Sequence, residues 1–225
     1  MVNLLPYPKL SYCFVFVNTD GLGGRGYTGN MKLIIGIGNP GEEYENTRHN
    51  VGFWIVGEIL KQNGPSYAKA SAGENFQFSK KLNAEMAKVK LNGKTVILAR
   101  PQTFVNKSGE AVKKLKLFYK TKPEDIVVAH DDLDIEFGSF KLSFGKDSGG
   151  HRGVQSIIDH LKTNKFWRLR IGTANRKLVT ARHQRTLKSK KEAVGQFVLS
   201  KFTPTEQTEL RKVIKKTIEK LASAV

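Results

Sequence analysis

Cysteine is nearly absent from this sequence, because Cys13 is the only one among 225 residues. An intrachain disulfide is therefore excluded, and a reducing compartment such as the cytoplasm fits best. No apolar run approaches the ~20 residues that a transmembrane helix needs, so we expect no membrane contact. The sequence also lacks a G-x-S-x-G motif, and we find no serine or cysteine in the setting of a catalytic nucleophile.

Acidic residues are scarce as well. The chain has 38 Lys and Arg against 20 Asp and Glu, which gives a net charge of +18. A charge of this size says nothing about the fold, but it favours a polyanionic partner, because a basic surface attracts phosphate backbones and releases their counterions. The alternative is a soluble protein whose basic surface has no nucleic-acid partner.

The chain length suits one domain with a substantial core. The first 30 residues differ from the rest, with two prolines, five glycines and few charges. We interpret residues 1–30 as a disordered extension, or as sequence upstream of a start at Met31, with a targeting peptide as the less favoured alternative. The folded domain is then expected to span residues 31–225.

From Met31 onward, strand and helix patterns alternate, which is typical of an α/β domain. Because a hairpin around Asn92-Gly93 occurs beside strands joined by helices, we expect a single domain with a mixed, mostly parallel sheet flanked by helices. Strands are expected at residues 32–37, 82–90, 95–99, 125–130, 139–144 and 167–172, and helices at 51–61, 108–120 and 154–162. A last long helix should begin at Pro204, with Thr203 and Glu206 forming a capping box.

Residues 175–191 contain seven cations and no acid. A block of like charges repels itself, so we expect this segment to be mobile, and it is also suited to lie on nucleic acid. Its cations are Arg176, Lys177, Arg182, Arg185, Lys188, Lys190 and Lys191.

Gly36, Gly38 and Gly41 follow the first expected strand in the spacing G-x-G-x-x-G, the fingerprint of a dinucleotide-binding turn. Such a turn needs a helix that begins at the third glycine, so that its free N–H groups face the phosphates. Here Pro40 interrupts the turn, and "EEYENTRHN" follows, which has no apolar face and places carboxylates beside the phosphate site. The loop therefore favours another kind of site over a dinucleotide site.

Polar residues recur where the expected strands end, or where a helix begins. In an α/β sheet the loops beyond the carboxyl ends of the strands meet in one crevice, so these residues are candidates for a common site. They are Asn39, Tyr44, His49, Asn106, Asp131 and His151.

The chemistry of this set is coherent. A histidine is a base near neutral pH, an aspartate at its other ring nitrogen fixes the tautomer, and asparagine amides donate hydrogen bonds to an oxyanion. Water would then be the nucleophile. Two alternatives stay open at this point: "HDDLD", from His130 to Asp134, also has metal-ligand types, and each histidine alone is more often a structural hydrogen-bonding residue.

Five stretches together resemble the bacterial-type peptidyl-tRNA hydrolases. They are "LIIGIGNPGEEYENTRHNVGF", "RPQTFVNKSGEAV", "VVAHDDLDIEFGSFKLSFGKDSGGHRGVQSI", "FWRLRIGT" and "VGQFVLSKFTPTEQ", and they keep the order of that family. The resemblance implies a metal-independent esterase without a cofactor, which releases peptide from the 3′ end of tRNA. It also implies a cytoplasmic protein, which we expect to be a monomer.

The resemblance assigns roles to several residues. His49 would activate water, Asp131 would orient His49, and Asn39 and Asn106 would bind the peptide main chain or the oxyanion. Tyr44, Phe104 and His151 match positions that line the family's cleft. As tRNA contacts we expect Lys141, Lys146, Arg168 and Arg170.

One position departs from the family, which usually has "GGHNG" where this chain has "GGHRG". Arg152 cannot accept a hydrogen bond and always carries a charge, so it cannot replace the asparagine. We expect Arg152 to contact tRNA instead. This departure supports the main alternative, a non-catalytic RNA-binding protein on the same fold; the retained His49, Asn39, Asn106 and Asp131 argue against it. A dinucleotide-dependent oxidoreductase is the third hypothesis, and it predicts saturable NAD(P) binding.

Overall fold

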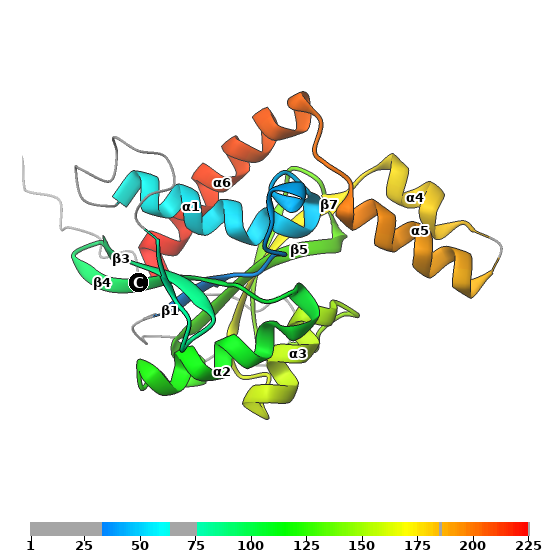
Figure 1. The fold of residues 1–225 in the computed structure, drawn as a ribbon. Helices are drawn as coiled ribbons and strands as arrows, with labels where there is room; N and C mark the ends of the chain where they lie inside the picture. The colour runs from blue at the N-terminus through cyan, green and yellow to red at the C-terminus, as the bar shows by residue number, and fades with distance from the viewer. Residues whose placement is uncertain (1–32, 64–75, 185, 225) are drawn as a thin grey trace, which may run out of the picture.

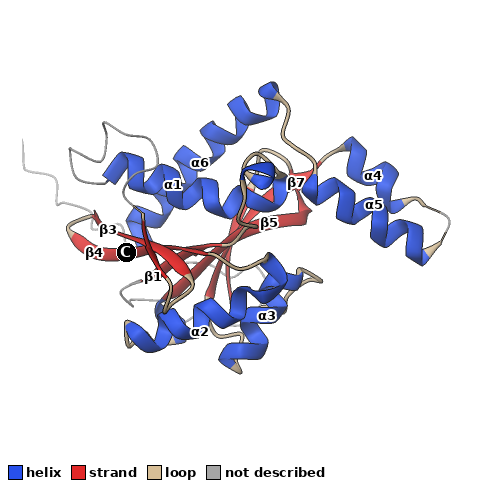
Figure 2. Ribbon diagram, in the orientation of Figure 1, coloured by secondary structure: helices blue, strands red, loops and turns tan. Residues whose placement is uncertain are grey.

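A seven-stranded sheet forms the centre of the protein, with helices on both faces (Figures 1 and 2). The computed structural model describes residues 33–63, 76–184 and 186–224. The expected extension 1–30 lies outside this part of the chain. The strand order is β2-β3-β4-β1-β5-β7-β6. The strands are β1 (Leu33–Gly36), β2 (Gln77–Ser79), β3 (Ala84–Leu91), β4 (Lys94–Pro101), β5 (Ile126–Glu136), β6 (Phe140–Phe144) and β7 (Trp167–Ala174).

The sheet is mixed, as predicted. The four adjacent strands β4, β1, β5 and β7 run parallel. Antiparallel pairs flank them, with β3 and β2 beyond β4 and β6 beyond β7. The β3–β4 hairpin turns at Asn92 and Gly93, which both have positive φ (47° and 78°), as the favoured two-residue hairpin turn requires. The carboxyl ends of the four parallel strands therefore share one edge of the sheet.

Two hydrophobic cores lie on the two faces of the sheet. Helices α1 (Val51–Asn63) and α6 (Pro204–Ala224) cover one face, and α2 (Ser108–Phe118) and α3 (Arg152–Leu161) cover the other (Figure 1). The central strand β1 is buried along its whole length and contributes Ile34 to the first core and Leu33 and Ile35 to the second. No helix among the described residues is long and apolar enough to span a membrane.

Glycines allow β1 to approach α1 closely. A Cβ built on Gly36 would lie only 2.1 Å from the carbonyl oxygen of Gly52. Gly41 has φ 114°, a conformation that other residues rarely adopt. It is followed by a single 3-10 turn, η1 (Glu42–Tyr44), and the next α-helix begins only at Val51. The glycine spacing therefore serves packing and a sharp turn, and the helix that a dinucleotide turn needs is not formed at Gly41.

The basic segment 175–191 is folded into helices where it is described, and its mobility stays a prediction. It forms α4 (Arg176–Arg182) and the start of α5 (Leu187–Leu199), and we call these two helices the basic arm. Asn175 caps α4, since its Oδ1 accepts hydrogen bonds from two backbone N–H groups, and Thr186 forms a capping box with Ser189. The buried side chains of Leu178 and Phe197 anchor the arm, so capping and apolar contacts outweigh the charge repulsion.

Candidate active site

The candidate site lies at the carboxyl ends of the parallel strands. The loop after β1 contains Asn39 and ends in a second 3-10 turn, η2 (Arg48–Asn50), which carries His49. Asp131 lies within β5, and His151 directly precedes α3. The first turn of α3 packs against the neighbouring loops, because a Cβ on Gly153 would come within 3 Å of both Ile37 and Val105. Segments that are far apart in the sequence thus meet at this edge.

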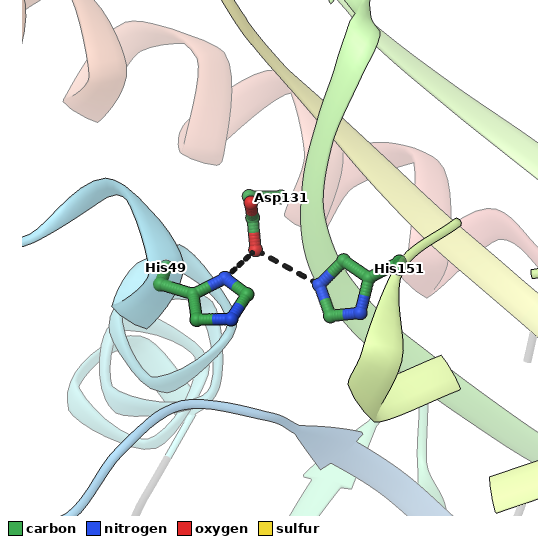
Figure 3. A group of neighbouring side chains, drawn as sticks. All are labelled: His49, Asp131 and His151. Carbon is green, nitrogen blue, oxygen red and sulfur yellow. Dashed lines mark hydrogen bonds and ion pairs between the residues drawn. The ribbon is translucent and has the colours of Figure 1, made fainter. Parts of the chain in front are cut away.

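His49, Asp131 and His151, which we call the triad, are joined through one carboxylate oxygen (Figure 3). The distance from Asp131 Oδ1 is 2.8 Å to His49 Nδ1 and 3.0 Å to His151 Nε2. The two imidazole rings lie with their centroids 5.1 Å apart. The Asp131 side chain is 2% exposed, whereas that of His49 is 17% exposed, so His49 has the wider opening to solvent.

The hydrogen bonds determine which ring nitrogens carry protons. Nδ1 of His151 accepts from the backbone N–H groups of Gly153 (3.1 Å) and Val154 (3.3 Å), so its proton is on Nε2, which donates to Asp131. An ionised carboxylate only accepts, so Nδ1 of His49 donates as well. Nε2 of neutral His49 therefore keeps a free lone pair, as a general base requires.

The local charges stabilise this arrangement. Burial alone would raise the pKa of Asp131, but the two histidines outweigh it and hold that pKa well below its usual range. Burial would lower the pKa of His49, and the charge and hydrogen bond of Asp131 raise it overall. The pair thus favours an ionised aspartate beside a histidine that binds a proton more tightly than usual.

The triad also has the composition of a metal site, since its ligand atoms lie within 4.8 Å of one another. The tautomer of His151 argues against this use. To bind a metal through Nε2, a neutral histidine needs its proton on Nδ1, but Nδ1 already accepts from two backbone N–H groups. The acids of "HDDLD" do not converge either: Asp132 pairs with Arg170 and Asp134 with Arg182, each at 2.7 Å.

His130 contacts two members of the triad, Asp131 and His151. It is fully buried, and its Nδ1 donates to the backbone carbonyl of Asp131 at 2.6 Å. Its ring packs edge-on against His151, with centroids 4.8 Å apart. Burial lowers the pKa of His130 well below its usual value, and the nearby His151 adds to this, so His130 remains neutral. His130 thus holds the backbone of Asp131 by a hydrogen bond and the ring of His151 by packing.

Asn39 connects the loop after β1 with the loop after β4. Its side-chain Oδ1 accepts from the backbone N–H of Val105 (2.9 Å), and its backbone is bonded in both directions to the side chain of Asn50, each at 2.9 Å. Because Oδ1 is occupied, the amide NH₂ of Asn39 is the group that remains to donate to a ligand. Asn50, which the sequence analysis did not select, holds the backbone of Asn39, and the Val105 N–H orients its side-chain amide.

The remaining predicted lining residues belong to the same two loops. Tyr44 packs edge-on against Phe104, with ring centroids 6.3 Å apart. Phe104 is 54% exposed, and Asn106 is also exposed in the 3-10 turn η4 (Val105–Lys107). An aromatic pair thus joins the loop after β1 to the loop after β4, and an exposed amide lies two residues beyond Phe104.

Comparison with known proteins identifies the family. A family model described as peptidyl-tRNA hydrolase matches residues 33–225. The chain belongs to the peptidyl-tRNA hydrolase family. It is 43% identical to the peptidyl-tRNA hydrolase of Aquifex aeolicus over 195 residues, which cover 87% of this chain and 90% of that protein. This confirms the resemblance to the bacterial-type enzymes.

Solved structures of peptidyl-tRNA hydrolases share the fold. The crystal structure of the Acinetobacter baumannii protein matches with a TM-score of 0.71 and 34% identity, and the match covers 85% of this chain and 86% of that one. A peptidyl-tRNA hydrolase in complex with N-propanol matches with a TM-score of 0.73 and 33% identity, covering 87% and 89% of the two chains. The single α/β domain predicted from the sequence is therefore confirmed.

The cations that we expect to contact tRNA differ in their exposure to solvent. Lys141 and Arg152 are exposed, and Lys146 is partly exposed. Arg168, in contrast, is only 3% exposed, and its burial lowers its pKa to about 10. It lies in β7 on a face of the sheet that helices cover, so its side chain is not presented to solvent in this structure, and its contact with tRNA stays a prediction.

Arg48 and Glu206 are features of this family member that the sequence analysis did not connect with the site. Arg48 precedes His49 and is 1% exposed, and its guanidinium pairs with the Glu206 carboxylate. The sequence separation of 158 residues concealed the pair. The sequence indicated Glu206 only as part of the capping box, which the structure confirms through hydrogen bonds in both directions with Thr203.

Proposed function

We propose that this chain hydrolyses the ester bond between a peptide, or an N-blocked aminoacyl group, and the 3′ end of tRNA. The hydrogen bond from His49 Nδ1 to Asp131 carries the proposal, because it leaves His49 Nε2 as a base with access to solvent. Family membership supports the same reaction, since the named relatives are peptidyl-tRNA hydrolases.

The proposed reaction uses water as the nucleophile. His49 Nε2 takes one proton from water while the water oxygen bonds to the ester carbonyl carbon. The resulting tetrahedral intermediate loses the ribose oxygen, and His49 returns the proton to that oxygen as the C–O bond breaks. Free tRNA and a peptide with a new carboxyl group leave. Asp131 stays ionised throughout and stabilises the imidazolium that forms between the two proton transfers.

Asn39 and Asn106 are the proposed hydrogen-bond donors to substrate. The Asn39 amide NH₂ remains available, because its oxygen is bonded to Val105. Donors of this kind stabilise the charge that develops on the carbonyl oxygen. The rings of Tyr44 and Phe104 form an apolar rim suited to the side chain of the last amino acid of the peptide.

The proposed tRNA surface is built from cations on β6, β7 and α3. Lys141 lies directly opposite Arg170 in the β6–β7 pair, and Lys146 follows β6. Arg152, the first residue of α3, is next to His151 of the triad. The basic arm adds exposed lysines farther from the triad. Cations on one side of the site would hold the phosphates of the acceptor stem while its 3′ end reaches His49.

The proposal is tested by the hydrolysis of N-acetyl-aminoacyl-tRNA. The wild type should release N-acetyl amino acid, and His49→Ala should be slower by ~10²–10⁴-fold at saturating substrate. A variant that kept more than about a tenth of the wild-type rate would refute the role of His49. Tight tRNA binding without turnover by the wild type would instead favour the non-catalytic RNA-binding alternative. We also propose a monomer in the cytoplasm, which light scattering and fractionation would test.

A further inference from the structure

The side chain of Arg48, immediately before the proposed base, is held in an enclosed aromatic setting. Its guanidinium lies over the rings of Phe197 (4.9 Å to the centroid) and Phe202 (4.8 Å). Nη1 donates to the backbone oxygen of Lys201 at 3.1 Å, and Nη2 donates to Glu206 Oε1 at 2.5 Å. A fully buried guanidinium requires a charged partner, and Glu206 supplies it.

The backbone around Arg48 is attached to the same region. Its N–H donates to the carbonyl oxygen of Ser200 at 3.1 Å, and Thr47 forms an isolated antiparallel bridge with Lys201. The N–H of Phe202 donates to the carbonyl oxygen of Asn46 at 2.9 Å. These backbone bonds thus attach the loop that carries the proposed base to the segment between α5 and α6.

Glu206 is shared by three parts of the chain. Its Oε1 accepts from Arg48 and from the Nδ2 of Asn175 (2.9 Å), and its Oε2 accepts from the N–H of Thr203 (2.9 Å). Burial would raise its pKa, but the Thr203 N–H and Arg48 lower it overall, so the carboxylate stays charged. Capping α6 requires only the bond with Thr203, and the other two bonds reach segments outside that helix.

Arg48 is part of the same short turn as two residues of the site. The turn η2 consists of Arg48, His49 and Asn50. His49 meets Asp131 at 2.8 Å, and Asn50 is bonded in both directions to the backbone of Asn39. Within a three-residue turn, a shift of Arg48 displaces both neighbours.

We propose that the Glu206 carboxylate is a positioning group for the reaction, which through Arg48 fixes the turn that presents His49 to Asp131. Neither Glu206 nor Arg48 touches substrate in this assignment. The inference rests on the proposed function for its kinetic consequences, but its geometric claim concerns only the contact between His49 and Asp131.

The experiment compares Arg48→Lys and Glu206→Gln with the wild type in the full chain. Both changes keep roughly the residue size: Arg48→Lys cannot make the Lys201 and Glu206 bonds from one planar group, and Glu206→Gln removes the negative charge that pairs with Arg48. We expect kcat to fall roughly ten- to a hundredfold, because small misplacements of a catalytic group have effects of that order, while KM for tRNA stays near the wild-type value. In addition, the ¹H NMR titration of the His49 ring should move toward the ordinary histidine pKa, because contact with Asp131 is what raises it.

A second ion pair serves as the matched control. Glu85 pairs with Arg100 at 2.7 Å, and the Arg100 guanidinium also lies over an aromatic ring, that of Phe76, at 3.9 Å. Glu85→Gln should lower stability but leave kcat and the His49 titration unchanged. The inference is overturned if Arg48→Lys and Glu206→Gln keep kcat within about twofold and leave the His49 titration unchanged. If the wild type itself shows no hydrolysis, the proposed function fails, and the His49 titration alone still decides this inference.

Discussion

His151 donates a hydrogen bond from Nε2 to Oδ1 of Asp131 at a distance of 3.0 Å. The same ring caps α3 through Nδ1, so one side chain links a helix start to the carboxylate of the triad. Capping fixes the tautomer, and the tautomer ensures that Asp131 receives an N–H. His151 therefore positions the Asp131 carboxylate in addition to lining the site.

The two functions of His151 can be separated by mutation. Asparagine is a good N-cap but is too short to replace the bond to Asp131, whereas alanine removes both interactions. His151→Asn should thus be more stable to urea than His151→Ala by about 1 kcal/mol. Both variants should lose at least roughly tenfold in kcat, because a hydrogen bond to a charged group is worth ~1.5–3 kcal/mol. Wild-type kcat in His151→Asn would show that one donor to Asp131 suffices.

The pH dependence of hydrolysis follows from the raised pKa of His49. His49 accepts a proton only when it is neutral, so kcat/KM should rise with pH and reach half its maximum above about 6.5, the ordinary histidine value. In Asp131→Asn the raising charge is gone and burial remains, so the midpoint should move down while the maximum rate falls by ~10²-fold or more. A midpoint that stayed in place or rose would contradict the assigned pairing.

The predictable part of this structure is the part that obeys local rules. The period of the apolar residues indicates the parallel strands, and the rule that loops meet beyond strand ends brings His49 and Asp131 together from the sequence alone. The capping box at Thr203 can likewise be recognised in the sequence, because its two residues are three positions apart. A two-residue turn at Asn92-Gly93 belongs to the same class of local signal.

The failures come from interactions that depend on the tertiary structure. The charge pattern of the basic arm does not indicate its two helices, because a sum of charges does not include the caps and the buried Leu178 that hold them. The burial of Arg168 also has no local signal, because it follows from helices that cover both faces of this sheet. Arg48 carries no local signal, because its partner Glu206 is remote in sequence.

Arg152 offers a direct test of the proposed tRNA surface. It is exposed at the first position of α3, where a cation gains nothing from the helix dipole, so its charge is available for a phosphate. Arg152→Asn should raise KM for tRNA by roughly tenfold at low salt, about the worth of one charged hydrogen bond, and leave kcat unchanged. An increase in kcat would instead mean that the arginine impairs a site that functions better with the family's asparagine.

The basic arm makes the clearest prediction about salt. Lys188, Lys190 and Lys191 are exposed on α5, which with α4 projects at one end of the molecule (Figure 1). Replacing all three by glutamine should reduce the slope of log K for tRNA against log salt by up to ~0.9 for each phosphate that is no longer neutralised, because fewer counterions are released. The control replaces Lys113, Lys114 and Lys120, exposed lysines in and just after α2, by glutamine. It changes the net charge equally and should keep the wild-type slope. Equal slopes in the two triple variants would mean that net charge alone attracts tRNA and that the arm does not bind it specifically.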